Sequence, residues 1–214
     1  MSTNERILSP FTLPNGTELK NRLLMAPMTT CTGYYDGTVT SELVEYYRAR
    51  AGSIGTIIVE CCFVDDLGLA FPGAIGIDND EKIAGLAKIA DAIKSKGSKA
   101  LLQIYHGGRM VDPKLIGGRT PVGPSAVAAP RDGAATPVAL TSEEVEGMIG
   151  KFGEAVRRAI QAGFDGVEIH GANTYLIQQF YSPNSNQRDD EWGGSRDNRA
   201  KFPLAVLEIG RAHV

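Results

Sequence analysis

The sequence has few of the residues that mark secreted, metal-binding or nucleic-acid-binding proteins. Among 214 residues there are only three cysteines, Cys31, Cys61 and Cys62, an odd number that includes an adjacent pair. This set suits neither a disulfide framework nor a four-ligand zinc site, so we expect no metal and a location in the reducing cytoplasm. The net charge is −3, and no cluster of lysine and arginine would attract a nucleic-acid backbone or an anionic membrane. Neither partner is expected.

Long apolar runs are also missing. The longest, residues 56–64, is interrupted by Glu60 and is far shorter than the roughly 20 residues of a membrane span. The first six residues lack the charged and then apolar layout of a signal peptide. With 43% hydrophobic and 22% charged residues, the composition is typical of a soluble globular protein and not of a disordered chain.

Strand-like and helix-like segments alternate along the chain. Residues 11–13 and 17–19 flank an Asn-Gly turn and predict a hairpin. The short apolar run 22–25 predicts a first strand, and runs at residues 56–59, 100–104 and 166–169, apolar on both faces and rich in β-branched residues, predict buried parallel strands. Helical periodicity predicts helices at residues 43–50, 83–93, 145–160 and 195–207, the third of which begins with a capping box formed by Thr141 and Glu144.

This alternation predicts an α/β fold with a parallel sheet and outer helices, either an open doubly wound sheet or a (β/α)8 TIM barrel. The barrel is favoured because no Gly-x-Gly-x-x-Gly or phosphate loop follows a strand, and because the hairpin could plug the closed end of a barrel. The Gly/Pro-rich stretch 107–137 predicts a functional loop at the active-site end. We therefore expect residues 1–214 to hold the hairpin and the first four β/α units of one barrel domain.

The last predicted helix has no ordinary ending, because the chain stops at residues 211–214 without a Gly, a Pro or a polar tail that would end a helix. The sequence of residues 208–214 resembles an in-frame translation of a sequencing adapter. We expect that the reading frame is truncated here and that residues 208–214 are a non-native tail. A barrel's phosphate site is built after strands 7 and 8, so an inactive fragment is one open alternative.

Histidines are scarce, and two of the three, His106 and His170, directly follow predicted strands. Active-site residues of barrels lie at these strand ends. A buried, hydrogen-bonded histidine is the ordinary explanation for one such position, but two together favour a site. One alternative from the residues alone is a cofactor-free lyase or hydrolase, with His170 and Glu168 on the same strand face as acid and base.

Several segments together carry a more specific signal. In chain order they are Asn21-Arg22, Met25 to Thr29, Val59 to Cys61, Gln103 to Arg109, Val167 to Pro183, Ser185-Asn186, Arg188, Asp190, Gly193 to Ser195 and Asn198-Arg199. With this combination the chain resembles the Old Yellow Enzyme family of FMN-dependent ene-reductases and NADH:flavin oxidoreductases. The resemblance implies a TIM-barrel flavoprotein that passes hydride from NAD(P)H through FMN to an activated alkene of the enone type, or to another small-molecule acceptor. A homo-oligomer of the full-length protein is a further expectation.

The resemblance implies three catalytic residues. His170 and Asn173 match the pair that donates hydrogen bonds to the acceptor's carbonyl oxygen, where negative charge develops. One branch of the family has a second histidine where this chain has Asn173, and an asparagine still donates. Tyr175 matches the residue that protonates the α-carbon. Their structural alternatives are a packed histidine, a helix N-cap asparagine and a half-buried tyrosine in a first helical turn.

The resemblance also implies a flavin site. Pro27, Met28 and Thr29 match the segment beside the isoalloxazine ring, and the Thr29 hydroxyl would hydrogen-bond near the flavin C4 carbonyl. Cys61 matches a small residue after the second strand, and His170 also belongs to this set. Gln103 matches the amide that contacts the pyrimidine edge of FMN. A glutamine in an apolar strand needs a partner, either a ligand or a polar layer of the barrel.

Overall fold

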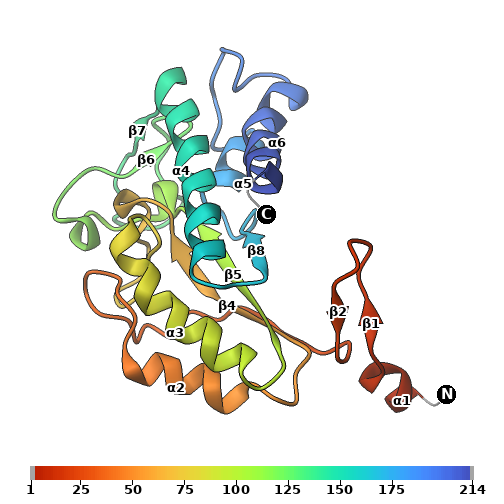
Figure 1. The fold of residues 1–214 in the computed structure, drawn as a ribbon. Coiled ribbons are helices and arrows are strands. Elements are labelled where there is room, and N and C mark those ends of the chain that lie inside the picture. Colours follow the sequence, from red (N-terminus) through yellow and green to blue (C-terminus); the bar gives the residue numbers. More distant parts are fainter. Residues whose placement is uncertain (1–2, 213–214) are drawn as a thin grey trace.

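A four-stranded parallel sheet forms the centre of the protein (Figure 1). The computed structural model describes residues 3–212. The strand order is β3 (Leu24–Met25), β4 (Thr56–Phe63), β5 (Lys99–Tyr105) and β8 (Gly166–Ile169). Every neighbouring pair is parallel. The four predicted strands are therefore confirmed, in the order in which they occur in the chain.

Helices follow each strand, as the alternation predicted. They are α2 (Ser41–Arg50) after β3, α3 (Ile83–Lys94) after β4, α4 (Ser142–Gln161) after β5, and α5 (Leu176–Tyr181) and α6 (Arg196–Ala212) after β8. Figure 1 shows α2, α3 and α4 on one side of the sheet. Helix α6 extends beyond the predicted end at residue 207, and residues 213–214 of the expected tail lie outside the described residues. Among the described residues, none of the helices is long and apolar enough to cross a bilayer.

The N-terminal hairpin forms as predicted, with β1 (Phe11–Thr12) antiparallel to β2 (Glu18–Leu19). A short helix that was not predicted, α1 (Thr3–Leu8), precedes it. The hairpin stands beside the parallel sheet in Figure 1. Asn15 at its tip lines a cavity of about 560 Å³, whose other walls include Val167 and Ile169 of β8 and Leu207 of α6.

Two short helical turns, η1 (Asp66–Gly68) and η2 (Asp80–Lys82), lie in the connection from β4 to α3. The connection from β5 to α4 contains two more, η3 (Gly108–Met110) and η4 (Pro113–Ile116), and two strand fragments that pair in parallel, β6 (Val122–Gly123) and β7 (Val138–Ala139). The buried Arg109 guanidinium donates to the carbonyl oxygens of Val127 and Ala128, 3.2 and 3.1 Å away. The loop predicted at residues 107–137 is thus a folded segment.

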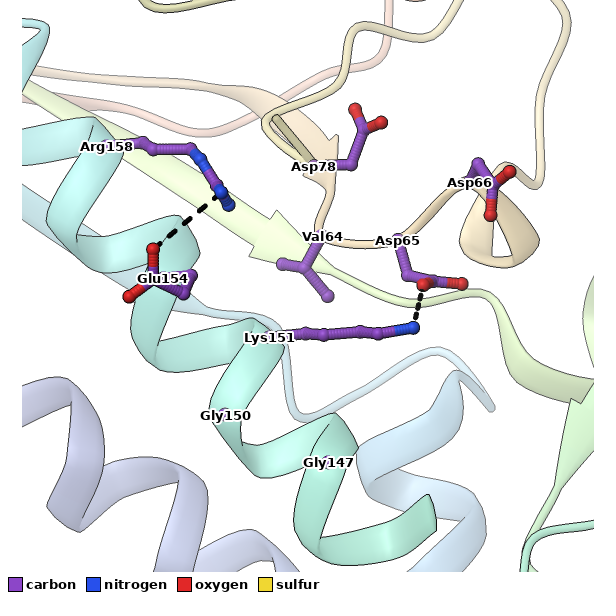
Figure 2. A pocket seen from close by; sticks show the side chains of 9 residues that line it. All are labelled: Val64, Asp65, Asp66, Asp78, Gly147, Gly150, Lys151, Glu154 and Arg158. Carbon is purple, nitrogen blue, oxygen red and sulfur yellow. Dashed lines mark hydrogen bonds and ion pairs between the residues drawn. The ribbon is translucent and has the colours of Figure 1, made fainter. Parts of the chain in front are cut away.

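Charged side chains connect α4 to the loop after β4 around a cavity of about 410 Å³ (Figure 2). Lys151 of α4 binds the Asp65 carboxylate, and Arg158 lies 3.7 Å from Glu154. Asp66 pairs with Arg119 and Asp78 with Lys82, so each charged group lining the cavity has an ionic partner. This cavity therefore holds no uncompensated charge.

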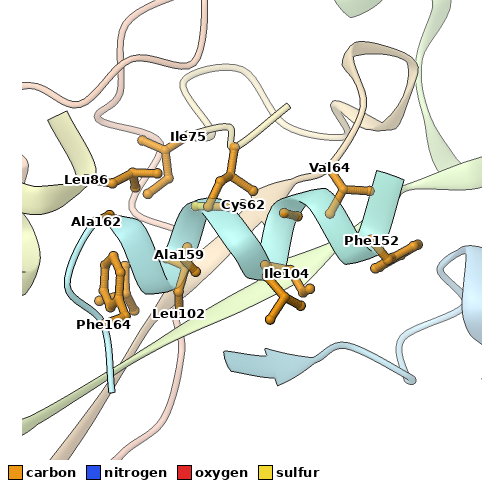
Figure 3. Close-up of a cluster of buried hydrophobic side chains, with 14 of the residues drawn as sticks. Cys62, Val64, Ile75, Leu86, Leu102, Ile104, Phe152, Ala159, Ala162 and Phe164 are labelled. Atoms are coloured by element: carbon orange, nitrogen blue, oxygen red, sulfur yellow. The ribbon is translucent and has the colours of Figure 1, made fainter. Parts of the chain in front are cut away.

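The main core lies between the sheet and the helices, where alternate residues of β4 and β5 meet α3 and α4 (Figure 3). In α4, Phe152 and Ala159 are fully buried against Leu102 and Ile104 of β5. These helix residues are seven positions apart, the spacing of a single helical face. The second core cluster lies at the other face and carboxyl end of the sheet, and includes Cys61, Phe63, Tyr105 and Tyr175.

The capping box predicted for α4 is present. Glu144 N donates to Thr141 Oγ1 at 3.2 Å, and Thr141 N donates to Glu144 Oε2 at 2.8 Å. We expect Thr141→Ala to lower the free energy of unfolding by about 1 kcal/mol. The Glu144 N–H then loses the hydroxyl that accepts its hydrogen bond, and the capping box is reduced to the bond from Thr141 N to Glu144. Chemical denaturation of the chain would measure this. A loss no larger than that of exposed Thr136→Ala would contradict a stabilising cap.

Candidate active site

An irregularity in β4 turns Cys61 towards the site. Val59 pairs with Leu102 and Cys62 pairs with Ile104, so two residues, Glu60 and Cys61, lie opposite Gln103 alone. Such a bulge reverses the alternation of side chains along a strand. Cys62 therefore packs in the core under the helices, while Cys61 joins the cluster at the other face.

Residues after β3 meet the bulge. Thr29 Oγ1 lies 3.3 Å from Cys61 Sγ, and Thr30 N donates to Glu60 Oε1 at 3.3 Å. Pro27 is half-buried and the Met28 side chain is 65% exposed. The structure thus brings the side chains of Thr29 and Cys61 together and leaves the apolar side chain of Met28 open to solvent.

Gln103 and Glu168 form the next pair along the sheet. They are direct Cα partners in β5 and β8, so their side chains emerge on the same face. Gln103 Nε2 donates to Glu168 Oε1 at 2.6 Å. The Gln103 side chain is buried, and its oxygen accepts no hydrogen bond within residues 3–212. Among the described residues, Glu168 thus binds Gln103, and no hydrogen bond joins Glu168 to His170.

His170 directly follows β8, where its N–H still donates to Ile104 O at 3.0 Å. Its Nδ1 accepts from Ala172 N at 3.3 Å. Partial burial lowers the pKa of His170, with the negative charge of Glu168 acting in the opposite direction. The ring is therefore neutral at pH 7, and because Nδ1 accepts, the proton lies on Nε2. His170 Nε2–H is a fixed donor.

Tyr175 lies among aromatic rings. Its ring centroid is 4.9 Å from that of His170 with perpendicular planes, 5.2 Å from that of Tyr105 and 6.4 Å from that of Phe71. Burial, with a smaller effect of Cys61, raises the pKa of Tyr175 to about 12. The phenol therefore keeps its proton at neutral pH, as an acid that delivers a proton to a carbanion must.

Asn173 and Thr174 form a strained turn between His170 and Tyr175. Their φ angles are 52° and 61°, in the left-handed region that a β-branched threonine rarely adopts. Asn173 is exposed, and the residue at the N-cap of α5 is Tyr175. The N-cap alternative for Asn173 is therefore wrong, and its amide is free of that structural task.

The buried Gln179 holds this turn, and the sequence analysis missed it. Its Nε2 donates to Thr174 O at 2.6 Å and to Gly107 O at 3.1 Å, while its Oε1 accepts from Arg109 N at 3.1 Å. A Cβ on Gly108, whose φ is +57°, would lie 2.2 Å from that oxygen. Gln179 thus ties the turn to the loop after β5. The sequence signal that could have revealed Gln179 is a side-chain amide on the buried, apolar side of the short helix α5.

Glu60 is a second missed residue, which in the sequence was an interruption of an apolar run and one position of a family segment without a role of its own. It is fully buried, and burial raises the pKa of its carboxyl group while hydrogen bonds from Thr30 and Tyr47 oppose the rise. Tyr47 OH donates to Glu60 Oε2 at 3.2 Å and accepts from Glu60 N at 2.8 Å. This network holds the bulge against α2.

The two histidines serve different roles. His106 is buried, accepts from Gly108 N at Nδ1, 3.0 Å away, and directs Nε2 towards Asp65 Oδ1 at 3.6 Å. The hydrogen bonds and charges of His106 and Lys151 lower the pKa of Asp65 although burial acts to raise it. No trio of His, Cys, Asp or Glu side chains in the described part of the chain is grouped to hold a metal ion. His106 is thus fixed inside the fold by Gly108 and Asp65, whereas His170 lies beside the Tyr175 ring just after β8.

Four strand ends therefore present one set of groups: a hydroxyl and a thiol from β3 and β4, an amide from β5, and an imidazole followed by a phenol from β8. The sequence profile of the NADH:flavin oxidoreductase / NADH oxidase family matches residues 6–214. The chain belongs to this family. The expected family is confirmed, and with it an enzyme class in which a flavin and NADH take part.

Two proteins with names that state an acceptor are similar to this chain. It is 88% identical over 209 residues to the NADH:fumarate oxidoreductase of Klebsiella pneumoniae, covering 98% of this chain and 23% of that protein. The NADH:acrylate oxidoreductase of Vibrio harveyi is 59% identical over 202 residues, covering 94% of this chain and 20% of that protein. The chain thus spans about a quarter of the length of the former and a fifth of the latter.

The fold agrees with a solved member of the family. The old yellow enzyme homologue of Zymomonas mobilis has 34% sequence identity and a TM-score of 0.89, covering 97% of this chain and 60% of that one. The parallel sheet β3-β4-β5-β8 and the helices that follow its strands match part of the TIM barrel of that homologue. The predicted fold class is confirmed.

Proposed function

We propose that this chain is the NADH- and FMN-binding part of an oxidoreductase that reduces an activated alkene, an enone or an unsaturated carboxylate. The observation that carries the proposal is the set of proton donors beside Gln103: the neutral His170, the exposed Asn173 amide and the protonated Tyr175. The two relatives named for fumarate and acrylate, both alkenes conjugated to a carboxylate, support this acceptor class.

The residues fit FMN as the cofactor. The Gln103 oxygen lacks a donor within residues 3–212, Met28 offers an open apolar side chain, and Thr29 has a hydroxyl at the same strand end. These are the apolar and polar contacts that a flat heteroaromatic ring requires. Pro27, Met28, Thr29, Cys61 and Gln103 would hold the flavin. When bound, it would accept hydride from NADH and pass hydride to the acceptor.

The chain's own residues would act on the acceptor. His170 Nε2–H and the Asn173 amide would donate to its carbonyl or carboxylate oxygen, where negative charge grows as hydride arrives. Tyr175 would supply a proton to the α-carbon. The perpendicular packing of Tyr175 against His170 fixes the direction of both groups.

A second candidate function follows from the coverage. Because the chain spans only 23% and 20% of the relatives named for fumarate and acrylate, the alkene reaction of those proteins could take place in a part that this chain does not match. This chain would then take hydride from NADH and pass electrons onward.

We further propose that residues 1–214 are the N-terminal part of one barrel domain, on the basis of the 60% of the solved homologue that they cover. Tests of activity therefore need this chain within a complete barrel, called the complete enzyme below. A cytoplasmic location agrees with the three unpaired thiols. A measurement of the molar mass of the complete enzyme in solution would test for a homo-oligomer.

The decisive experiment is reconstitution of the complete enzyme. We expect it to bind one FMN, to lose the flavin absorbance band when NADH is added without oxygen, and to recover the band when an enone, fumarate or acrylate follows. Failure to bind FMN would overturn the proposal. Hydrolytic or lyase activity of flavin-free protein on the same compounds would favour the cofactor-free alternative instead.

A further inference from the structure

Glu168 lies between two side chains of the proposed site, Gln103 and His170, and neither the family resemblance nor the proposed function gives it a task. It is half-buried near the end of β8. Its neighbours in sequence, Val167 and Ile169, pack against the core under the helices. The Glu168 side chain therefore emerges on the opposite face, together with Gln103 and His170.

The chemistry of the pair fixes the orientation of the Gln103 amide. A carboxylate only accepts hydrogen bonds, whereas a side-chain amide has one donating and one accepting end. Gln103 Nε2 faces Glu168 Oε1 at 2.6 Å, a short distance typical of a hydrogen bond to a charged group. The reverse orientation would place two acceptor oxygens against each other. The carboxylate therefore leaves Gln103 Oε1 on the other side of the amide.

The strand register makes this arrangement rigid. Gln103 and Glu168 are direct Cα partners within a ladder that includes Leu102 with Val167 and Ile104 with Ile169. On the other side of Gln103, the Glu60–Cys61 bulge faces it, and among the described residues this bulge donates no hydrogen bond to the Gln103 oxygen. Within the part of the chain described, Glu168 is thus the single hydrogen-bond partner of the Gln103 side chain.

We infer that Glu168 is a positioning residue: it fixes the Gln103 amide so that Gln103 Oε1 accepts a hydrogen bond from an N–H group of the flavin. The inference rests on the proposed function, since it needs FMN at this site. It assigns Glu168 to cofactor recognition and not to acid–base chemistry. A ligand that offers an N–H at this edge is favoured, and one that offers only an acceptor there is disfavoured.

The test measures the dissociation constant of FMN for the apoprotein of the complete enzyme, by quenching of flavin fluorescence. We expect Glu168→Leu to raise it about 10-fold or more, since the amide loses its charged partner. Glu168→Gln should stay within about 3-fold of the unaltered enzyme, because the new amide can present its own oxygen to Gln103 Nε2. Glu143→Gln on the exposed face of α4 is the matched control, with no expected change.

A double-mutant cycle separates positioning from general support of the fold. If Glu168 acts through Gln103, the double variant Gln103→Leu/Glu168→Leu should bind FMN no more weakly than Gln103→Leu alone. Additive losses, or a Glu168→Leu variant that binds like the unaltered enzyme, would overturn the inference. If Glu168→Leu does not fold, Glu168→Asp, whose shorter side chain keeps the charge but does not reach Gln103, takes its place with the same expectations.

The result also separates this inference from the proposed function. Unaltered complete enzyme that binds no FMN overturns both statements. Unaltered enzyme that binds FMN, combined with additive effects in the cycle, overturns only the role of Glu168.

Discussion

Replacement of both His170 and Asn173 by alanine should slow alkene reduction by the complete enzyme about 10²–10³-fold, equivalent to roughly 2.7–4 kcal/mol in the barrier. The reason is the loss of two donors aimed at the oxygen on which negative charge develops. His170 is a suitable donor because its Nδ1 accepts from Ala172 N and leaves the proton on Nε2. Steady-state rates with an enone and with fumarate or acrylate would measure the effect.

One control variant and a measurement of flavin content accompany this prediction. Asn184→Ala changes an exposed asparagine just beyond α5 and should leave the rate unchanged. The flavin content of each variant is determined by absorbance, so that loss of cofactor is not mistaken for loss of catalysis. Unchanged turnover in the double variant with full flavin occupancy would remove both residues from the acceptor site.

The positions of strands and helices were predictable because the signals are local. The apolar run of β4 and the apolar face of α4 can each be recognised from residues that are close together in the sequence. The two residues of the capping box, Thr141 and Glu144, are only three positions apart. The crossovers predicted a parallel sheet, and the sequential order of its four strands agrees with the barrel that was favoured over a doubly wound sheet. Family resemblance supplied the site residues, and no pattern of spacing would have singled out Tyr175.

What the sequence did not reveal depends on contacts between distant segments. The bulge at Glu60 and Cys61 exists only in the register between β4 and β5. The hydrogen bonds of Gln179 join residues about 70 positions apart. Its partners are backbone carbonyl and N–H groups, which every residue type offers, so the sequence does not reveal them. Asn173 was mistaken for a possible N-cap because the strained turn delays the start of α5 to Leu176.

Replacement of Tyr175 by phenylalanine should separate the two halves of the reaction. Transfer of hydride from NADH to the flavin needs no proton from the phenol, so flavin reduction should stay near the rate of the unaltered enzyme. Reoxidation by an alkene should slow on the order of 10²–10⁴-fold, because the α-carbon must then take its proton from water. Removing only the hydroxyl keeps the ring contacts with His170, Tyr105 and Phe71.

Stopped-flow absorbance of the flavin band measures both phases, and Tyr181→Phe, an exposed tyrosine at the end of α5, is the matched control. Because the pKa of Tyr175 is raised to about 12, the phenol stays protonated throughout pH 6–10 and reoxidation should show no loss from its ionisation in that range. Equal slowing of both phases would assign Tyr175 to packing. Unchanged phases in Tyr175→Phe, together with continued alkene turnover, would place alkene reduction in another part of the protein and favour the second candidate function.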